Sequence, residues 1–189
     1  PARRRHAPGQ ALGAGLITGD GRHIAGRPTS QGATPVAFAG FLTDLAKPCQ
    51  IVTTAAGAAG TSAITSSAVD MAGYDGCLFL VAMGPIVANG VQSIKLQQSS
   101  DDASADDYSD IVGTSQTIAD DADNTSFLID VRRPEKRYLK LVVSRATQNA
   151  TVGVVYAIPY NKKSRGAALT AGTAITGAER FMFPAEGTA

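Results

Sequence analysis

The sequence predicts an all-β protein, an antiparallel β-sandwich or jelly-roll-like barrel with long extended N- and C-terminal arms. Two observations lead to this class. Between residues 63 and 160, apolar and polar residues alternate with a period of two in short stretches that are separated by polar turns. In the same region no window of about twelve residues carries an apolar stripe with helical spacing.

About seven short strands are expected in this region. The alternation is clear in "SIKLQQ", where Ile94 and Leu96 share one face and Lys95 and Gln97 share the other. Shorter or less regular stretches such as "AITSSAVDM", "CLFLVAM" and "TSQTIA" complete the pattern. In chain order, the stretches expected to form strands are 63–71, 77–83, 93–98, 114–119, 127–131, 138–144 and 151–160.

The three C-terminal strands have well-defined apolar faces. "ATQNAT" (146–151) is expected to form a turn between the last two, and Pro159 to end the last strand or mark a sheet edge. The side chains expected to share an apolar face are Phe127, Ile129 and Val131 in the first, Leu139, Leu141 and Val143 in the second, and Val152, Val154, Tyr156 and Ile158 in the third.

Composition divides the chain into three parts: an extended Gly- and Arg-rich N-terminal arm (1–61), the β body (62–160) and an extended C-terminal tail (161–189). Ordering a residue costs roughly 1–2 kcal/mol of backbone entropy, and the two ends have few large apolar residues to offset that cost. We therefore expect the ends to become ordered on a partner.

Charge and composition exclude several classes of function. The formal net charge is only +1, so the chain lacks the overall field that gathers nucleic acid. The longest apolar run, 78–88, is too short to span a membrane. Cys49 and Cys77 match no metal or disulfide motif, and His6 and His23 are too few for a metal site or a catalytic triad. We expect no enzyme activity, no cofactor and no resident metal.

Basic residues gather where the fifth expected strand leads into the sixth, in "RRPEKR". Pro134 predicts a turn, which places long cationic side chains at a hairpin corner. A solvated corner without function, contact with an acidic partner, and nucleic-acid binding are three interpretations. The last is disfavoured because no aromatic residues interleave the basic ones. The candidate partner-binding residues are Arg132, Arg133, Lys136 and Arg137.

Acidic residues gather in 99–110 and 119–124. Clustered carboxylates suit Ca²⁺, but no glycine lies at the bend and no glutamate closes a twelve-residue loop, as an EF-hand needs. The favoured interpretation is a solvated acidic loop that contacts the basic corner of the same chain or of a neighbouring copy. The glycine-rich stretches 13–21 and 55–62 lack the ending of a phosphate-binding loop.

Several motifs together resemble small structural proteins of tailed bacteriophages of the capsid decoration or cement type. They are "VDMAGYDGCLFLVAMG", "SIKLQQSSDDASADDYSD", "FLIDVRRPEKRYLKLVVSRAT" and the terminal "PAEGTA". The resemblance runs from about Ala63 to Lys163, with a fainter echo at the C-terminal end. It implies a virion protein on the capsid surface, made in the host bacterial cytoplasm, that binds the major capsid protein and forms a homo-oligomer. The long N-terminal arm departs from that pattern, so a head–tail connector is an alternative.

A cement role needs arms with anchoring residues. In the arms, the candidates for partner binding are Arg3, Arg4, Arg5, Leu16, Ile17, Phe38, Phe181, Met182 and Phe183. A carbohydrate-binding or host-adhesion module is an alternative of another class. It is disfavoured because the chain has no Trp and only five Tyr, whereas sugar-binding platforms are usually aromatic.

Overall fold

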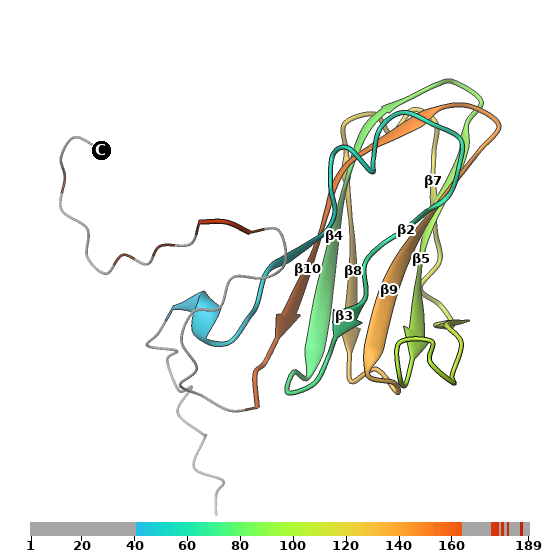
Figure 1. The fold of residues 1–189 in the computed structure, drawn as a ribbon. Coiled ribbons are helices and arrows are strands. Elements are labelled where there is room, and N and C mark those ends of the chain that lie inside the picture. Colours follow the sequence, from blue (N-terminus) through green and yellow to red (C-terminus); the bar gives the residue numbers. More distant parts are fainter. Residues whose placement is uncertain (1–40, 164–174, 178, 180, 182–185, 187–189) are drawn as a thin grey trace, which may run out of the picture. The chain divides into compact units, whose positions relative to one another are not determined.

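A computed structural model describes residues 41–163, 175–177, 179, 181 and 186. Apart from one 3-10 turn, η1 (Leu42–Asp44), the regular structure in these residues is all β, in two antiparallel sheets (Figure 1). The strands are β1 (Cys49–Val52), β2 (Ile64–Thr65), β3 (Val69–Asp70), β4 (Gly76–Ile86), β5 (Val91–Ser99), β6 (Ser109–Asp110), β7 (Gln116–Ile118), β8 (Ser126–Arg132), β9 (Tyr138–Ala146) and β10 (Ala150–Tyr160).

The two sheets have different strand orders. Sheet A has the order β1-β10-β4-β8, and sheet B has the order β2-β9-β5-β6, with β3 also paired to β9 and β7 also paired to β5. Consecutive strands β4 and β5 lie in different sheets, as do β9 and β10, so the chain repeatedly crosses between layers. The predicted fold class, an antiparallel β-sandwich, is confirmed.

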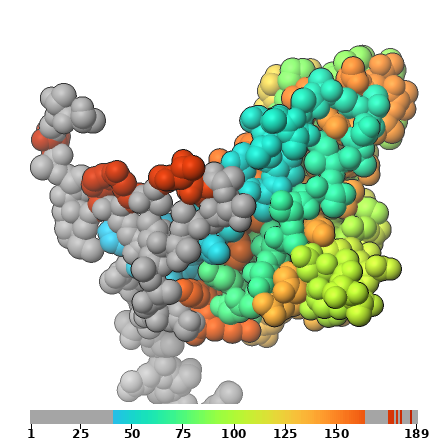
Figure 2. All heavy atoms as spheres, viewed as in Figure 1, coloured from blue at the N-terminus to red at the C-terminus, as the bar shows by residue number. Residues whose placement is uncertain are grey.

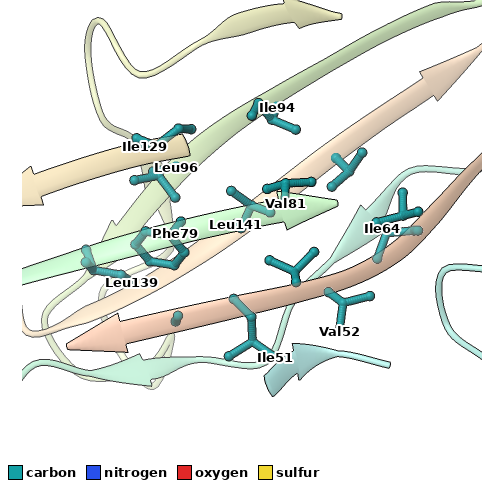
Figure 3. Packing of buried hydrophobic residues seen from close by; sticks show 14 of the residues in the cluster. Ile51, Val52, Ile64, Phe79, Val81, Ile94, Leu96, Ile129, Leu139 and Leu141 are labelled. Carbon is teal, nitrogen blue, oxygen red and sulfur yellow. The ribbon is translucent and has the colours of Figure 1, made fainter. Parts of the chain in front are cut away.

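The core lies between the sheets and is built from the predicted alternation (Figure 3). Ile94 and Leu96 from β5, and Leu139, Leu141 and Val143 from β9, are fully buried. They face the buried Phe79 and Val81 of β4 across the sandwich. Burying a side chain of this size contributes about 1.5–3 kcal/mol, so these long strands supply much of the stability of the fold.

The predicted face of β10 is wrong beyond Val152. The pairing with β4 shifts register between Val152 and Val154, and this irregularity reverses the alternation. Val155, Ala157 and Pro159 therefore point into the core, while Val154, Tyr156 and Ile158 point outward and are half-buried. Pro159 does not end the strand: it lies one residue before its end, opposite Cys77 of β4.

Two other elements differ from the expected organisation. Strand β1 lies within residues 1–61, which the sequence analysis assigned to the arm, because its four residues pair with β10 and add Ile51 and Val52 to the core. The stretch 63–71 forms two short strands: β2 pairs with the middle of β9, and β3 pairs with its start. Between them, the buried Ser66 hydroxyl accepts a hydrogen bond from the amide of Leu141 at 3.0 Å.

The expected turn at 146–151 joins β9 to β10, and Thr147 adopts a left-handed conformation there. In the part of the chain that the structure describes, no helix is long and apolar enough to cross a membrane.

Candidate interaction surface at the basic corner

The basic corner, residues 132–137, joins the end of β8 to the start of β9. Arg133 has a positive φ of 52°, a conformation that is uncommon for a residue other than glycine. Its backbone amide donates a 2.7 Å hydrogen bond to the Asp75 carbonyl in the turn before β4. The following Pro134 has a restricted φ, and together these features fix the direction in which the arginines point.

Arg132 and Arg133 share one carboxylate. The Nε atoms of the two side chains lie 3.3 Å and 3.2 Å from the Asp75 oxygens. Burial opposes ionisation of Asp75, but the hydrogen bonds from both arginines outweigh it and hold the pKa of that carboxyl below its usual range. The arginine side chains are 65% and 76% exposed, so two solvated guanidinium groups are held by one acid.

Arg137 forms the most regular ion pair of the corner. Its Nε and a terminal nitrogen donate to the two oxygens of Asp70 on β3, at 2.8 Å and 2.7 Å. This paired geometry is the strong form of an arginine–carboxylate contact. The hydrogen bond from Arg137 holds the pKa of Asp70 below its usual range. The guanidinium also lies 5.0 Å from the centre of the Tyr138 ring.

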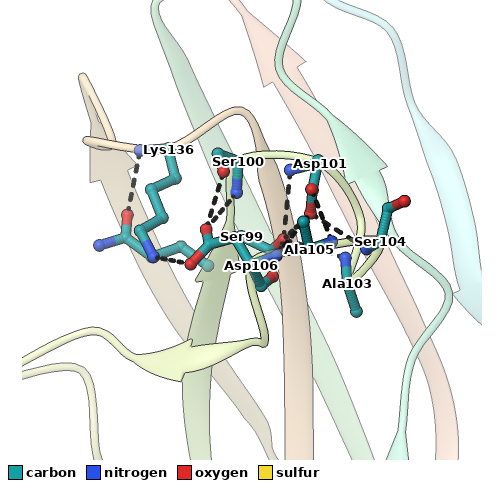
Figure 4. A network of polar contacts seen from close by, with 9 residues as sticks. Ser99, Ser100, Asp101, Ala103, Ser104, Ala105, Asp106 and Lys136 are labelled. Atoms are coloured by element: carbon teal, nitrogen blue, oxygen red, sulfur yellow. Dashed lines mark hydrogen bonds and ion pairs between the residues drawn. The ribbon is translucent and has the colours of Figure 1, made fainter.

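Lys136 connects the corner to the acidic loop, residues 99–110 (Figure 4). Its Nζ lies 2.8 Å from Asp106, and on β9 the Nζ of Lys140 lies 3.3 Å from Asp102. The hydrogen bond from Lys136, with further bonds from Ser100, lowers the pKa of Asp106 to about 2. The acidic loop therefore contacts basic residues of its own chain.

Within the acidic loop, carboxylates accept hydrogen bonds from the backbone. Asp101 accepts from the amides of Ser104, Ala105 and Asp106 at 2.7–3.1 Å. Asp106 accepts from both the amide and the hydroxyl of Ser100. These bonds make the loop a compact knob beside the end of β5, in yellow-green in Figure 2. Among the described residues, no group of three or more His, Cys, Asp or Glu is placed to hold a metal ion.

A shallow pocket of about 580 Å³ lies against the corner. The turn before β4 (71–75), corner residues 133–137 and Lys163 line it. The Lys163 amide donates to the carbonyl of Gly73 at 2.9 Å, which fixes this part of the chain beside the turn. Four basic and two acidic side chains line the pocket, and two of the basic ones, Lys136 and Arg137, are paired with Asp106 and Asp70.

The four corner residues predicted from the sequence thus lie together, and each contacts a carboxylate of its own chain. The sequence does not indicate Asp70 and Asp75 as partners of the corner, because their pairing with it depends on the topology of the two sheets. Phe181 of the tail is 67% exposed. The other arm candidates lie outside the described residues: Arg3, Arg4, Arg5, Leu16, Ile17, Phe38, Met182 and Phe183.

The two thiols are unpaired. Cys77 is buried in β4, and Cys49 of β1 is half-buried. Burial raises the pKa of the Cys77 thiol well above its ordinary value, which keeps it protonated and unreactive.

No protein-family model matches the chain, and no curated protein matches it. Among solved structures, it is similar to part of a chain in the structure of infectious bursal disease virus, Gt strain, with a TM-score of 0.33 and 12% identity. The match covers 62% of this chain and 30% of the viral chain, so it spans less than a third of that protein. A similarity this remote supports no conclusion about function.

Proposed function

We propose that the chain is a non-enzymatic virion structural protein of a tailed bacteriophage, which decorates and cements the capsid by bridging subunits of the major capsid protein. It acts at the capsid surface after synthesis in the host cytoplasm. The motifs of the β body that resemble the decoration and cement family support this role. The structural observation that carries the proposal is the basic corner, a group of exposed arginine side chains and a half-buried lysine held in place by the protein's own carboxylates.

The corner suits binding to an acidic protein surface. Asp70, Asp75 and Asp106 fix its cations before any partner arrives, which lowers the entropy cost of association. Asp75 is shared by two arginines, so these two guanidinium groups have only one carboxylate between them. The exposed Glu135 of the same corner balances the remaining charge over the corner as a whole, so the cations are exposed but locally matched. The adjacent pocket can accept an acidic side chain from the partner.

Nucleic acid is a poorer fit for the same surface. Single-stranded nucleic acid is usually held by exposed aromatic rings beside the basic groups. Of the described aromatic residues, only Phe181 is exposed, and Tyr74 and Tyr138 at the corner are half-buried. The corner therefore offers charge without a stacking platform.

The experiment is a binding assay on purified phage heads that lack this protein. We expect Arg132→Glu with Arg133→Glu to weaken head binding about tenfold or more, because two cations become anions at the contact. Lys95→Glu is the control for a charge reversal elsewhere on the surface, since Lys95 forms an ion pair with Asp110 away from the corner. Equal occupancy of the heads by the corner variant and the control would refute a role of the corner.

Copy number in the virion tests the role itself. Quantitative mass spectrometry of purified particles should give a count comparable to that of the major capsid protein. A count of about a dozen would instead fit a symmetric ring at the head–tail junction and would overturn the decoration role.

A further inference from the structure

The outer face of sheet A is apolar along its two central strands, β10 and β4. In β4, Cys77, Phe79 and Val81 point into the core, so Leu78, Leu80 and Ala82 point outward. The register places them opposite outward residues of the neighbouring strands, which lie side by side in Figure 1. The rows across the sheet are Tyr156–Leu80–Leu128, Ile158–Leu78–Asp130 and Val154–Ala82–Ser126.

The outer face of sheet B has the opposite character. Its central strand β5 presents Ser93, Lys95 and Gln97, while Ile94 and Leu96 point into the core. The neighbouring β9 presents Lys140 and Ser144, and its outward Val142 is buried. A sheet with one solvated face is expected to be polar on that face, as sheet B is. Sheet A departs from this rule in β10 and β4 and at Leu128 of β8, whose other outward residues, Ser126, Asp130 and Arg132, are polar.

The charge and shape of the apolar face suit a second copy of the same face. Its charged residues lie at one margin and are already engaged: Asp130 accepts a 2.8 Å hydrogen bond from the Tyr160 hydroxyl, and Arg132 is paired with Asp75. Two copies can therefore stack without bringing unpaired like charges together. Sheets from two copies would pack face to face as the two layers of a sandwich do.

The available area sets the strength of such a contact. With strands about 4.8 Å apart and about 3.3 Å per residue, three strands over the seven paired positions of β4 and β8, with the four residues of β1, offer roughly 400 Å² per copy. The total of roughly 800 Å² is below the roughly 1,000 Å² expected of a stable specific interface, which corresponds to a weak, reversible dimer.

We propose that two copies of this protein associate through the outer faces of their A sheets, with Leu80, Leu128 and Tyr156 at the centre of the contact. The inference does not depend on the proposed capsid role, because it rests only on the composition and register of this sheet.

The test is sedimentation equilibrium of the full chain from about 1 to about 200 µM, together with two matched variants. Leu128→Asp places a charge on the apolar face of sheet A, at a residue that is 55% exposed. Val91→Asp places the same charge on sheet B, at a residue that is 59% exposed. Both positions are open to solvent, so both variants should fold, which circular dichroism checks. We expect a monomer–dimer equilibrium for the unmodified chain, a dissociation constant at least about tenfold higher for Leu128→Asp, and little change for Val91→Asp.

Several outcomes would overturn the proposal. A dimer that survives Leu128→Asp uses another surface. A chain that stays monomeric throughout the range, with Leu128 protected from hydroxyl-radical oxidation, covers the face with a segment of its own. A chain that stays monomeric and whose Leu128 is oxidised by hydroxyl radicals leaves this face exposed to solvent, which also contradicts the proposal.

Discussion

Removing the guanidinium of Arg145 should destabilise the body far more than removing any arginine of the basic corner. Arg145 lies on β9 with only 8% of its surface exposed. Its Nε donates to the Ser62 carbonyl at 2.7 Å, and one terminal nitrogen donates to the carbonyls of Ala58 and Ala150 at 2.6 Å and 2.9 Å. It thus ties the segment between β1 and β2 to the start of β10, and burial lowers its pKa.

The expected magnitude follows from these three bonds. A hydrogen bond to a charged group contributes about 1.5–3 kcal/mol, so three of them are worth at least about 4.5 kcal/mol before any offset. Replacing a buried cation by an apolar side chain also removes its desolvation cost, which returns part of that sum. We expect Arg145→Met to lower the free energy of unfolding by about 2–4 kcal/mol, since the methionine still fills the space.

The assay is urea unfolding of the full chain, followed by far-UV circular dichroism. Arg132→Met is the control, because the side chain of Arg132 is exposed and solvent-exposed ion pairs contribute little. Arg145→Lys should lower the free energy of unfolding almost as much as Arg145→Met does, because one ammonium group cannot reproduce the planar guanidinium that reaches three carbonyls. If Arg145→Met unfolded at the same urea concentration as Arg132→Met, the role assigned to the buried guanidinium would be wrong.

Three further predictions concern single contacts. In the described part of the chain, neither the side-chain nitrogen nor the side-chain oxygen of the buried Gln92 has a hydrogen-bond partner. Gln92→Met should therefore raise the free energy of unfolding by about 1 kcal/mol, which moves the urea midpoint to a higher concentration. A Cβ on Gly57 would lie 1.8 Å from the Val152 carbonyl oxygen, so Gly57→Ala should cost about 1–3 kcal/mol or more in the same assay. Because folding lowers the pKa of Asp106 to about 2, its contribution to stability is complete above about pH 4 and is lost as the pH falls towards 2; carboxyl NMR titration should show a higher Asp106 pKa in Lys136→Met.

Each of these has a clear contrary result. A lower urea midpoint for Gln92→Met would mean that the amide is bonded in solution. Gly153→Ala is the control for Gly57→Ala, because an added Cβ there meets nothing closer than 3.3 Å. Equal losses from the two glycine variants would contradict the steric reasoning. An Asp106 pKa that does not respond to Lys136→Met would mean that the ion pair is not formed in solution.

The sequence predicts the sandwich because a period of two is a local property. Ile94, Leu96, Leu139 and Leu141 are buried as their spacing requires. The same spacing fails in β10, where one shift of register after Val152 reverses every following side chain. A shift of this kind depends on the neighbouring strand, so it cannot be read from a single stretch of sequence.

The basic corner shows a similar division. Its position follows from a proline between two alternating stretches, but its partners do not. In the sequence, Asp70 lies 67 residues before Arg137, and Asp75 lies 57 residues before Arg132. Only the topology of the sheets brings these groups together. The role of Arg145 cannot be read from the sequence. The alternation places it on the inward face of β9, but arginine is usually a surface residue, and the three carbonyls that it contacts lie far away or across a turn in the chain.

The apolar outer face of sheet A does have a sequence signal. A strand buried on both faces is apolar at nearly every position, whereas a strand covered on one face alternates. The run from Cys77 to Met83 is apolar throughout, and so is the run from Val154 to Ile158. Both patterns predict strands covered on two sides, yet in the described body only their inner faces meet the other sheet. The composition of these two strands, whose outward side chains are half-buried in the described body, therefore favours the proposed association through this face.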